Sequence, residues 1–289
     1  MLWIGSANGG GLNRLANASF IGYTKSNGLV GEFAWTLLQS RDGSMYFNTS
    51  NAGVARLKSG AFSFFTKERN GLLSNAGRAM MEDAEGVLWV GSAESGVSCV
   101  KNGRVVKTYT TATGLLGDNI RVLFEDSKRR VWIGSFNSGL QCLEHGKFTS
   151  WTEKNGLCGN KPRTVLESSD GTIWIGTSGG LNALRPGASK LEQYTTAQGL
   201  TMNSVLSLHE DESGALWLGM NRGGLHRYKN GKFTHCSIEH GLFDENVYSI
   251  LDDGLGNFWM SCNFGVFRVS KAELNAFMDG RAAHIVCTV

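Results

Sequence analysis

The chain has 289 residues, of which 18% are charged, and its formal net charge is +3. This mild charge argues against a nucleic-acid-binding protein, and the basic run at residues 126–130 (DSKRR) is predicted to be a solvated turn. No run of about 18 apolar residues is present, so the sequence predicts no membrane contact by this segment. The uniform composition predicts a single domain over residues 1–289.

A repeat of 42 or 43 residues runs through the whole chain. Its first marker is an aromatic residue in phrases such as LWIG, and it falls at Trp3, Tyr46, Trp89, Trp132, Trp174, Trp217 and Trp259. Its second marker is the dipeptide Gly-Leu, at 28–29, 71–72, 114–115, 156–157, 199–200 and 241–242. Two markers in phase predict a repeat protein, and this period is typical of propeller blades or helical arrays.

In chain order, residues 2–24 contain three predicted strands, and the apolar strand that leads every later repeat is absent there. In the repeat around Trp174, a leading strand at 164–168 (TVLES) precedes the marker strand, and two more strands follow it. Asn-Gly at 102–103 and 230–231 is typical of two-residue hairpin turns. Residues 270–280 predict a helix, with Ser at its start and Gly at its end.

Four strands in each of seven repeats predict an all-β fold, a seven-bladed β-propeller of four-stranded antiparallel blades. Each blade would pack between two others, so that both faces of its sheet are buried. The marker aromatics are then predicted to be core residues on the second strand of each blade. The first blade is expected to lack its own inner strand or to borrow one, and Met1 is expected to be a boundary within a longer protein.

The repeats at 114–152 (GLLGDNIRVLFEDSKRRVWIGSFNSGLQCLEHGKFTSWT) and 199–237 resemble the two-component regulator propeller repeat. The resemblance extends over essentially the whole chain, and the tail resembles a late repeat in which a helical insert precedes the outer strand. It implies the sensor region of a two-component signalling protein, often a hybrid histidine kinase. It also implies a periplasmic or extracytoplasmic location, the rest of a sensor kinase as partner, and a response to polysaccharide fragments. No signal peptide is predicted within the chain itself.

One repeat position predicts a ligand site. The residue six places after the leucine of each Gly-Leu marker should start the innermost strand of its blade, at the mouth of the propeller's central channel. Around the ring, this residue is Trp35, Arg78, Arg121, Arg163, Leu206 and Tyr248. Guanidinium groups bind oxyanions and aromatic faces can stack on sugar rings, so an anionic or neutral oligosaccharide is the expected ligand. Alternatively, the arginine stems simply cover apolar surface. Further candidates in the loops between second and third strands are Asn8, Asn51, Glu94, Phe136, Asn137, Asn221, Arg222, Asn263 and Phe264.

Catalytic residues are not predicted, and neither is a cofactor or a metal. The six histidines share no acidic partner in the expected channel, and His209 is interpreted as a core residue. The acidic pairs at 82–83, 125–126, 210–211 and 252–253 are interpreted as caps of the following turns. The six cysteines have no metal-ligand spacing and are expected to be free. Two other functions remain open: an enzyme similar to the streptogramin lyases, or a scaffold for binding another protein.

Overall fold

The structure of this protein is a computed structural model that describes residues 2–5, 12–16, 19–31, 34–49 and 51–289. By its internal contacts the chain divides into two compact units, Met1–Ser150 and Trp151–Val289. They are called unit 1 and unit 2 below, and each is described by itself.

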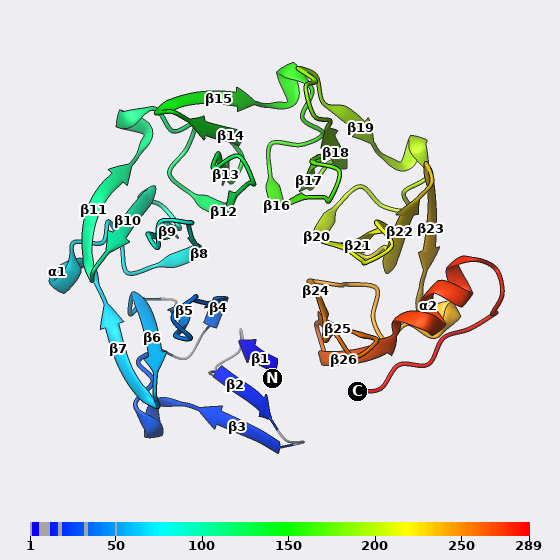
Figure 1. Cartoon of the computed structure of the whole chain (residues 1–289), viewed down its shortest axis with the longest axis horizontal. Helices are drawn as coiled ribbons and strands as arrows, with labels where there is room; N and C mark the ends of the chain where they lie inside the picture. Colours follow the sequence, from blue (N-terminus) through cyan, green and yellow to red (C-terminus); the bar gives the residue numbers. More distant parts are fainter. Residues whose placement is uncertain (1, 6–11, 17–18, 32–33, 50) are drawn as a thin grey trace. The chain divides into compact units, whose positions relative to one another are not determined.

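Unit 1 contains the first four sheets, each formed by consecutive antiparallel strands (Figure 1). The strands are β1 (Leu2–Gly5), β2 (Leu12–Ala16) and β3 (Ser19–Tyr23); β4 (Ala34–Gln39), β5 (Met45–Thr49), β6 (Val54–Lys58) and β7 (Ala61–Phe65); β8 (Gly77–Glu82), β9 (Leu88–Ser92), β10 (Val97–Lys101) and β11 (Arg104–Tyr109); and β12 (Ile120–Glu125), β13 (Val131–Ser135), β14 (Gly139–Glu144) and β15 (Lys147–Trp151). Short helical turns join successive sheets: η1 (Lys25–Asn27), α1 (Lys67–Asn70) and η2 (Thr111–Thr113).

Unit 2 contains three further sheets and the longest helix of the described chain. Its strands are β16 (Pro162–Glu167), β17 (Ile173–Thr177), β18 (Leu181–Leu184) and β19 (Glu192–Tyr194); β20 (Val205–Glu210), β21 (Leu216–Met220), β22 (Leu225–Lys229) and β23 (Lys232–Cys236); and β24 (Ser249–Asp252), β25 (Asn257–Cys262) and β26 (Gly265–Ser270). The helical segments are η3 (Glu153–Asn155), η4 (Thr196–Gln198), η5 (Ile238–His240) and α2 (Lys271–Met278). After α2 the chain returns to β26, where Arg268 and Thr288 form an isolated antiparallel bridge in place of an outer strand.

These seven sheets of the described chain are the blades of a seven-bladed β-propeller, as the repeat predicts. Within the described residues the first blade has three strands and no inner strand, which is also as predicted. Every marker aromatic lies on the strand predicted for it, and Trp132 and Trp217 are fully buried. All five residues of β9, β13, β17 and β21 are buried, which is why these strands show no apolar–polar alternation.

The second acidic residue of each pair closes a turn and holds the marker tryptophan. Asp211 accepts hydrogen bonds from the backbone N–H groups of Ser213 and Ala215, and from the indole Nε1–H of Trp217 at 2.7 Å. Asp83, Asp126 and Asp253 make the same set of contacts in their own blades. The predicted capping role is therefore confirmed. The contact also satisfies an indole N–H that would otherwise be buried without a partner.

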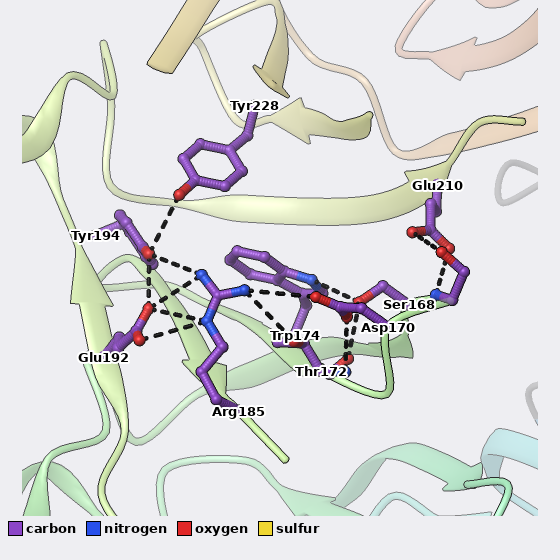
Figure 2. A network of polar contacts seen from close by, with 10 residues as sticks. Ser168, Asp170, Thr172, Trp174, Arg185, Glu192, Tyr194, Glu210 and Tyr228 are labelled. Carbon is purple, nitrogen blue, oxygen red and sulfur yellow. Dashed lines mark hydrogen bonds and ion pairs between the residues drawn. The ribbon is translucent and has the colours of Figure 1, made fainter. Parts of the chain in front are cut away.

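The blade that begins with β16 replaces this aspartate with two residues (Figure 2). The Ser168 hydroxyl accepts from the Trp174 indole and donates to Asp170, which accepts from the Thr172 backbone. Arg185 joins the same network: it lies over the Trp174 ring at 5.2 Å, pairs with Asp170, and bonds Glu192 and Tyr194. The repeat therefore keeps the tryptophan fixed even where its aspartate is missing.

The first acidic residue of each pair has a different role, because it reaches the preceding blade. Glu125 accepts from the backbone N–H of Ala84 at 2.8 Å, and Glu82 accepts from that of Arg41 at 3.0 Å. Glu210 makes the equivalent bond to Ser169 in unit 2. In the last blade this residue is the shorter Asp252, and Lys271 of α2 bonds both Asp252 and Glu212.

The cysteines are free, as the sequence predicts: Cys99, Cys142, Cys158, Cys236, Cys262 and Cys287. Burial raises the pKa of the Cys99 thiol to about 12, and it has the same effect on Cys142 and Cys236. These three thiols therefore remain protonated and unreactive at neutral pH, as small apolar core groups do.

Candidate functional site

Five of the six residues predicted to start the innermost strands lie at β-bulges, and the exception is Tyr248. The register between the first two strands shifts between Gly77 and Ala79, and the residue left out of the pairing is Arg78. The same irregularity leaves out Trp35 with Thr36, Arg121, Arg163 and Leu206. A bulge leaves its extra residue unpaired and redirects the side chain. This local geometry explains why long side chains at the start of a buried strand can reach solvent.

Trp35 and Arg78 lie together in unit 1. The Arg78 guanidinium carbon is 4.2 Å from the centre of the Trp35 ring, a close cation–π contact between neighbouring blades. Trp35 is 46% exposed, whereas the marker tryptophans Trp89 and Trp132 are 7% and 0% exposed. The bulge position thus provides an aromatic surface that the core tryptophans cannot provide.

These two residues belong to one concavity, called the unit 1 concavity here. Its lining residues are Trp35, Asn51, Ser74, Ala76, Arg78, Ala93, Glu94 and Ser95. They come from the bulges, from the loop that enters β8, and from the loops between second and third strands. The backbone joins these loops, because Gly53 N–H donates to Asn75 and Ala93 N–H donates to Ala76, both at 2.9 Å. Four of the predicted candidates, Trp35, Asn51, Arg78 and Glu94, are therefore brought into one site.

Arg121 occupies the next bulge, on β12, and is exposed. Its guanidinium carbon is 5.0 Å from the centre of the Phe136 ring, and its Nε–H donates to Asn119 at 3.0 Å. Arg121 does not line the unit 1 concavity. It pairs instead with the aromatic residue of its own blade's loop.

In unit 2, Arg163 is exposed at the bulge of β16. Tyr248 immediately precedes β24, is 46% exposed, and donates its hydroxyl to Asn263 at 2.7 Å. Phe264, beside Asn263, is 79% exposed. Tyr248 and Asn263, two predicted candidates, are thus in direct contact, while Arg163 lies in another blade.

The candidates at loop tips have a conformational explanation. Asn137 and Arg222 are exposed and adopt left-handed backbone conformations, with φ of 64° and 59°. Such conformations are uncommon outside glycine, and Asn is among the residues that tolerate them. The backbone N–H of Arg222 also donates to Asn246. Turn geometry therefore accounts for Asn137 without a ligand. Asn8, a further candidate, lies outside the described residues.

Polar residues on the third strands position the loops that enter the blades, and sequence reasoning missed them. Gln141 accepts from the backbone N–H of Leu116 and donates to the carbonyl of Gly114. Asn182 makes the same pair of bonds to Cys158 and Gly156. Ser98 accepts from Leu73, and His226 accepts from Thr201. Each of these four polar residues follows a buried aliphatic residue, in the segments SGVS, SGLQ, GGLN and GGLH. The polar residue that recurs at this repeat position is the sequence feature that could have predicted their role.

Two histidines of unit 2 are partly or fully buried. His209 packs edge-on against Phe258 at 5.1 Å, and its Nε2 lies 3.9 Å from Asp252. Burial lowers the pKa of His209, although the nearby Asp252 carboxylate acts in the opposite direction. His226 is fully buried and stacks on His235 at 5.5 Å. Among the described residues, no three side chains of His, Cys, Asp or Glu are grouped to hold a metal ion.

Fold and repeat together define a class: a β-propeller whose blades come from one recurring sequence unit. Residues 114–137 and 156–179 match the family model described as two component regulator propeller. These two repeats therefore match the family that the sequence predicts. None of the curated proteins matches the chain significantly. No helix in the described part is long and apolar enough to span a membrane.

Several solved structures share the fold. The extracellular domain of BT4673 from B. thetaiotaomicron, described as a one component system, has a TM-score of 0.75 and 18% identity, over 93% of this chain and 38% of its own. The extracellular domain of the hybrid two component system BT3049 from the same organism has a TM-score of 0.59 and 20% identity, over 92% of this chain and 42% of its own. Virginiamycin B lyase from Staphylococcus aureus has a TM-score of 0.70 and 14% identity, over 91% of this chain and 88% of its own. The chain thus spans less than half of the two extracellular domains, and these identities establish a common fold alone.

Proposed function

We propose that this chain is the ligand-binding propeller of an extracytoplasmic sensor, and that it binds oligosaccharide without catalysing a reaction. The observation that carries the proposal is the unit 1 concavity. It brings an exposed tryptophan, a cation and an anion together from segments far apart in the sequence. Pockets with an aromatic surface and a few placed polar groups are typical of small-ligand sites.

The chemistry of the concavity suits a sugar. One face of the Trp35 ring is covered by Arg78, and the ring remains 46% exposed, so it can stack on the apolar face of a pyranose. Arg78 supplies donors, Glu94 supplies acceptors, and Asn51 supplies both. Arg121 and Asn137 of unit 1, and Arg163, Tyr248 and Arg222 of unit 2, stay predicted ligand contacts.

The sensor assignment is supported by the repeats and by their relatives. Two-component regulator propeller repeats and fold neighbours that are extracellular domains both favour an extracytoplasmic location in the parent protein. The remainder of a sensor kinase is then the partner of this propeller. The signal it transmits would begin with ligand binding at the loops.

A second candidate function is that of a lyase. It is favoured by the fold match to virginiamycin B lyase, which covers most of both chains. Incubation with a streptogramin and a divalent cation, followed by mass spectrometry, separates the two functions. A lyase cleaves the antibiotic, whereas the proposed sensor leaves it intact.

Replacing Trp35 with alanine is expected to weaken oligosaccharide binding by about 2 kcal/mol, roughly 30-fold, because a central aromatic contact is lost. A thermal-shift screen of plant and microbial oligosaccharides identifies a ligand, since a ligand at 100 times its Kd stabilises the fold by about 2.7 kcal/mol. Calorimetry then compares wild type and variant. Equal affinity in both would place the site away from the concavity.

A further inference from the structure

We infer that the unit 1 concavity selects a neutral, hydroxyl-bearing sugar over an acidic one, and that Glu94 sets this preference. The inference rests on the proposed function and narrows its ligand class. The sequence alone left both anionic and neutral oligosaccharides open, because the arginines at the repeat position suggested a site for oxyanions.

The charges of the lining residues cancel. Arg78 and Glu94 are the charged residues among the eight, and the others are Trp35, Asn51, two serines and two alanines. In the described residues neither Arg78 nor Glu94 forms an ion pair. Their side chains are therefore available to a ligand, and the site presents one cation and one anion.

The position of Arg78 limits what it can do. Its planar guanidinium lies over the Trp35 ring, with the guanidinium carbon 4.2 Å from the ring centre. The N–H groups at the edge of that plane remain as donors. A sugar bound in the concavity against the exposed part of Trp35 would present its ring substituents to Arg78 and Glu94, which line the same concavity.

Hydrogen-bond chemistry decides between the ligand classes. A hydroxyl group both donates and accepts, so neighbouring hydroxyls can accept from Arg78 and donate to Glu94. A carboxylate or sulfate can only accept, and it would leave Glu94 facing a like charge in the same concavity. Like-charge contacts are a common device for rejecting the wrong partner. Arg78 alone would attract an acidic sugar, and Glu94 opposes this.

The test uses two acidic sugars, oligogalacturonate and oligoglucuronate, each compared with its fully methyl-esterified form, which replaces every carboxylate with a neutral ester. Calorimetry with the whole chain measures the ratio of the two affinities. Wild type is expected to recognise one of these acid–ester pairs, and within that pair to bind the ester about tenfold more tightly than the acid. Glu94→Gln keeps the side-chain shape, and it is expected to bring this ratio close to one by strengthening binding of the acid.

The matched control is Glu85→Gln, which removes the same charge from an exposed turn of the same blade and should leave the ratio unchanged. A wild type that prefers the acid, or a ratio that Glu94→Gln does not alter, overturns the inference while leaving sugar binding intact. A wild type that binds no oligosaccharide, neutral or acidic, overturns the proposed function together with the inference.

Discussion

Trp217→Ala is expected to lower the free energy of unfolding by about 3–5 kcal/mol, the range for truncating a buried aromatic side chain. Trp217 is fully buried and belongs to the cluster that also contains Phe258, Leu225 and Val247. Its ring packs edge-on against Phe258 at 5.3 Å. The change would leave a cavity between two blades and remove the indole partner of Asp211, itself a buried carboxylate. Both losses act in the same direction.

The matched control is Trp35→Ala, which removes the same side chain from an exposed bulge. It should cost less than about 1 kcal/mol, as surface changes usually do. Urea unfolding followed by far-UV circular dichroism measures both variants. Similar losses in the two would mean that the marker tryptophans are not the core of the blades.

His226→Gln is expected to remove much of the acid sensitivity of the fold. Burial lowers the pKa of His226 to about 3, and the neighbouring His235 adds to this effect. In the unfolded chain its pKa returns to about 6.5. As the pH falls, the unfolded state therefore takes up a proton before the folded state does. The contribution of neutral His226 to the free energy of unfolding is fully present above pH 6.5 and is lost between about pH 6.5 and pH 3. Over this whole range the loss is on the order of 5 kcal/mol.

Glutamine is the informative replacement, because Gln141 occupies the equivalent place and accepts from the equivalent backbone N–H. The variant should unfold with a flatter pH dependence while keeping the bond to Thr201. His284→Gln, at an exposed position, is the control and should leave the pH profile as in wild type. Thermal unfolding from pH 7 to pH 4 provides the comparison. A variant that is as acid-sensitive as wild type would show that His226 is not protonated on unfolding.

Much of the fold could be predicted from the sequence because each blade is encoded by one copy of the same repeat. Seven aromatics in phase indicated seven blades, and the missing apolar run before Trp3 indicated a first blade without an inner strand. The capping role was predicted correctly for the second acidic residue of each pair, since a carboxylate before a turn has an obvious backbone partner, but not for the first residue, which bonds the preceding blade. The separate roles of the two residues could not be predicted from the sequence, because they depend on how far Glu and Asp reach toward a neighbouring blade.

The candidate site was predicted only in part. Sequence phase placed Trp35 and Arg78 at one repeat position, but it could not show that they stack on each other or that Glu94 shares their concavity. These contacts depend on the bulge, which appears as an ordinary strand start in the sequence. Asn137 and Arg222 were chosen for chemistry, whereas their backbone conformation gives a second reason for their presence.

The most direct test of the central claim, that the unit 1 concavity is a binding site, compares Arg78→Ala with Arg104→Ala by calorimetry on an oligosaccharide that stabilises the wild type. Both arginines belong to the same blade, and Arg104 is exposed on its outer strand β11. Loss of Arg78 should weaken binding by about 1.5–3 kcal/mol, the range for hydrogen bonds to charged groups. Loss of Arg104 should leave the affinity within experimental error. Equal affinities for wild type and Arg78→Ala, or a larger loss for Arg104→Ala, would contradict the claim.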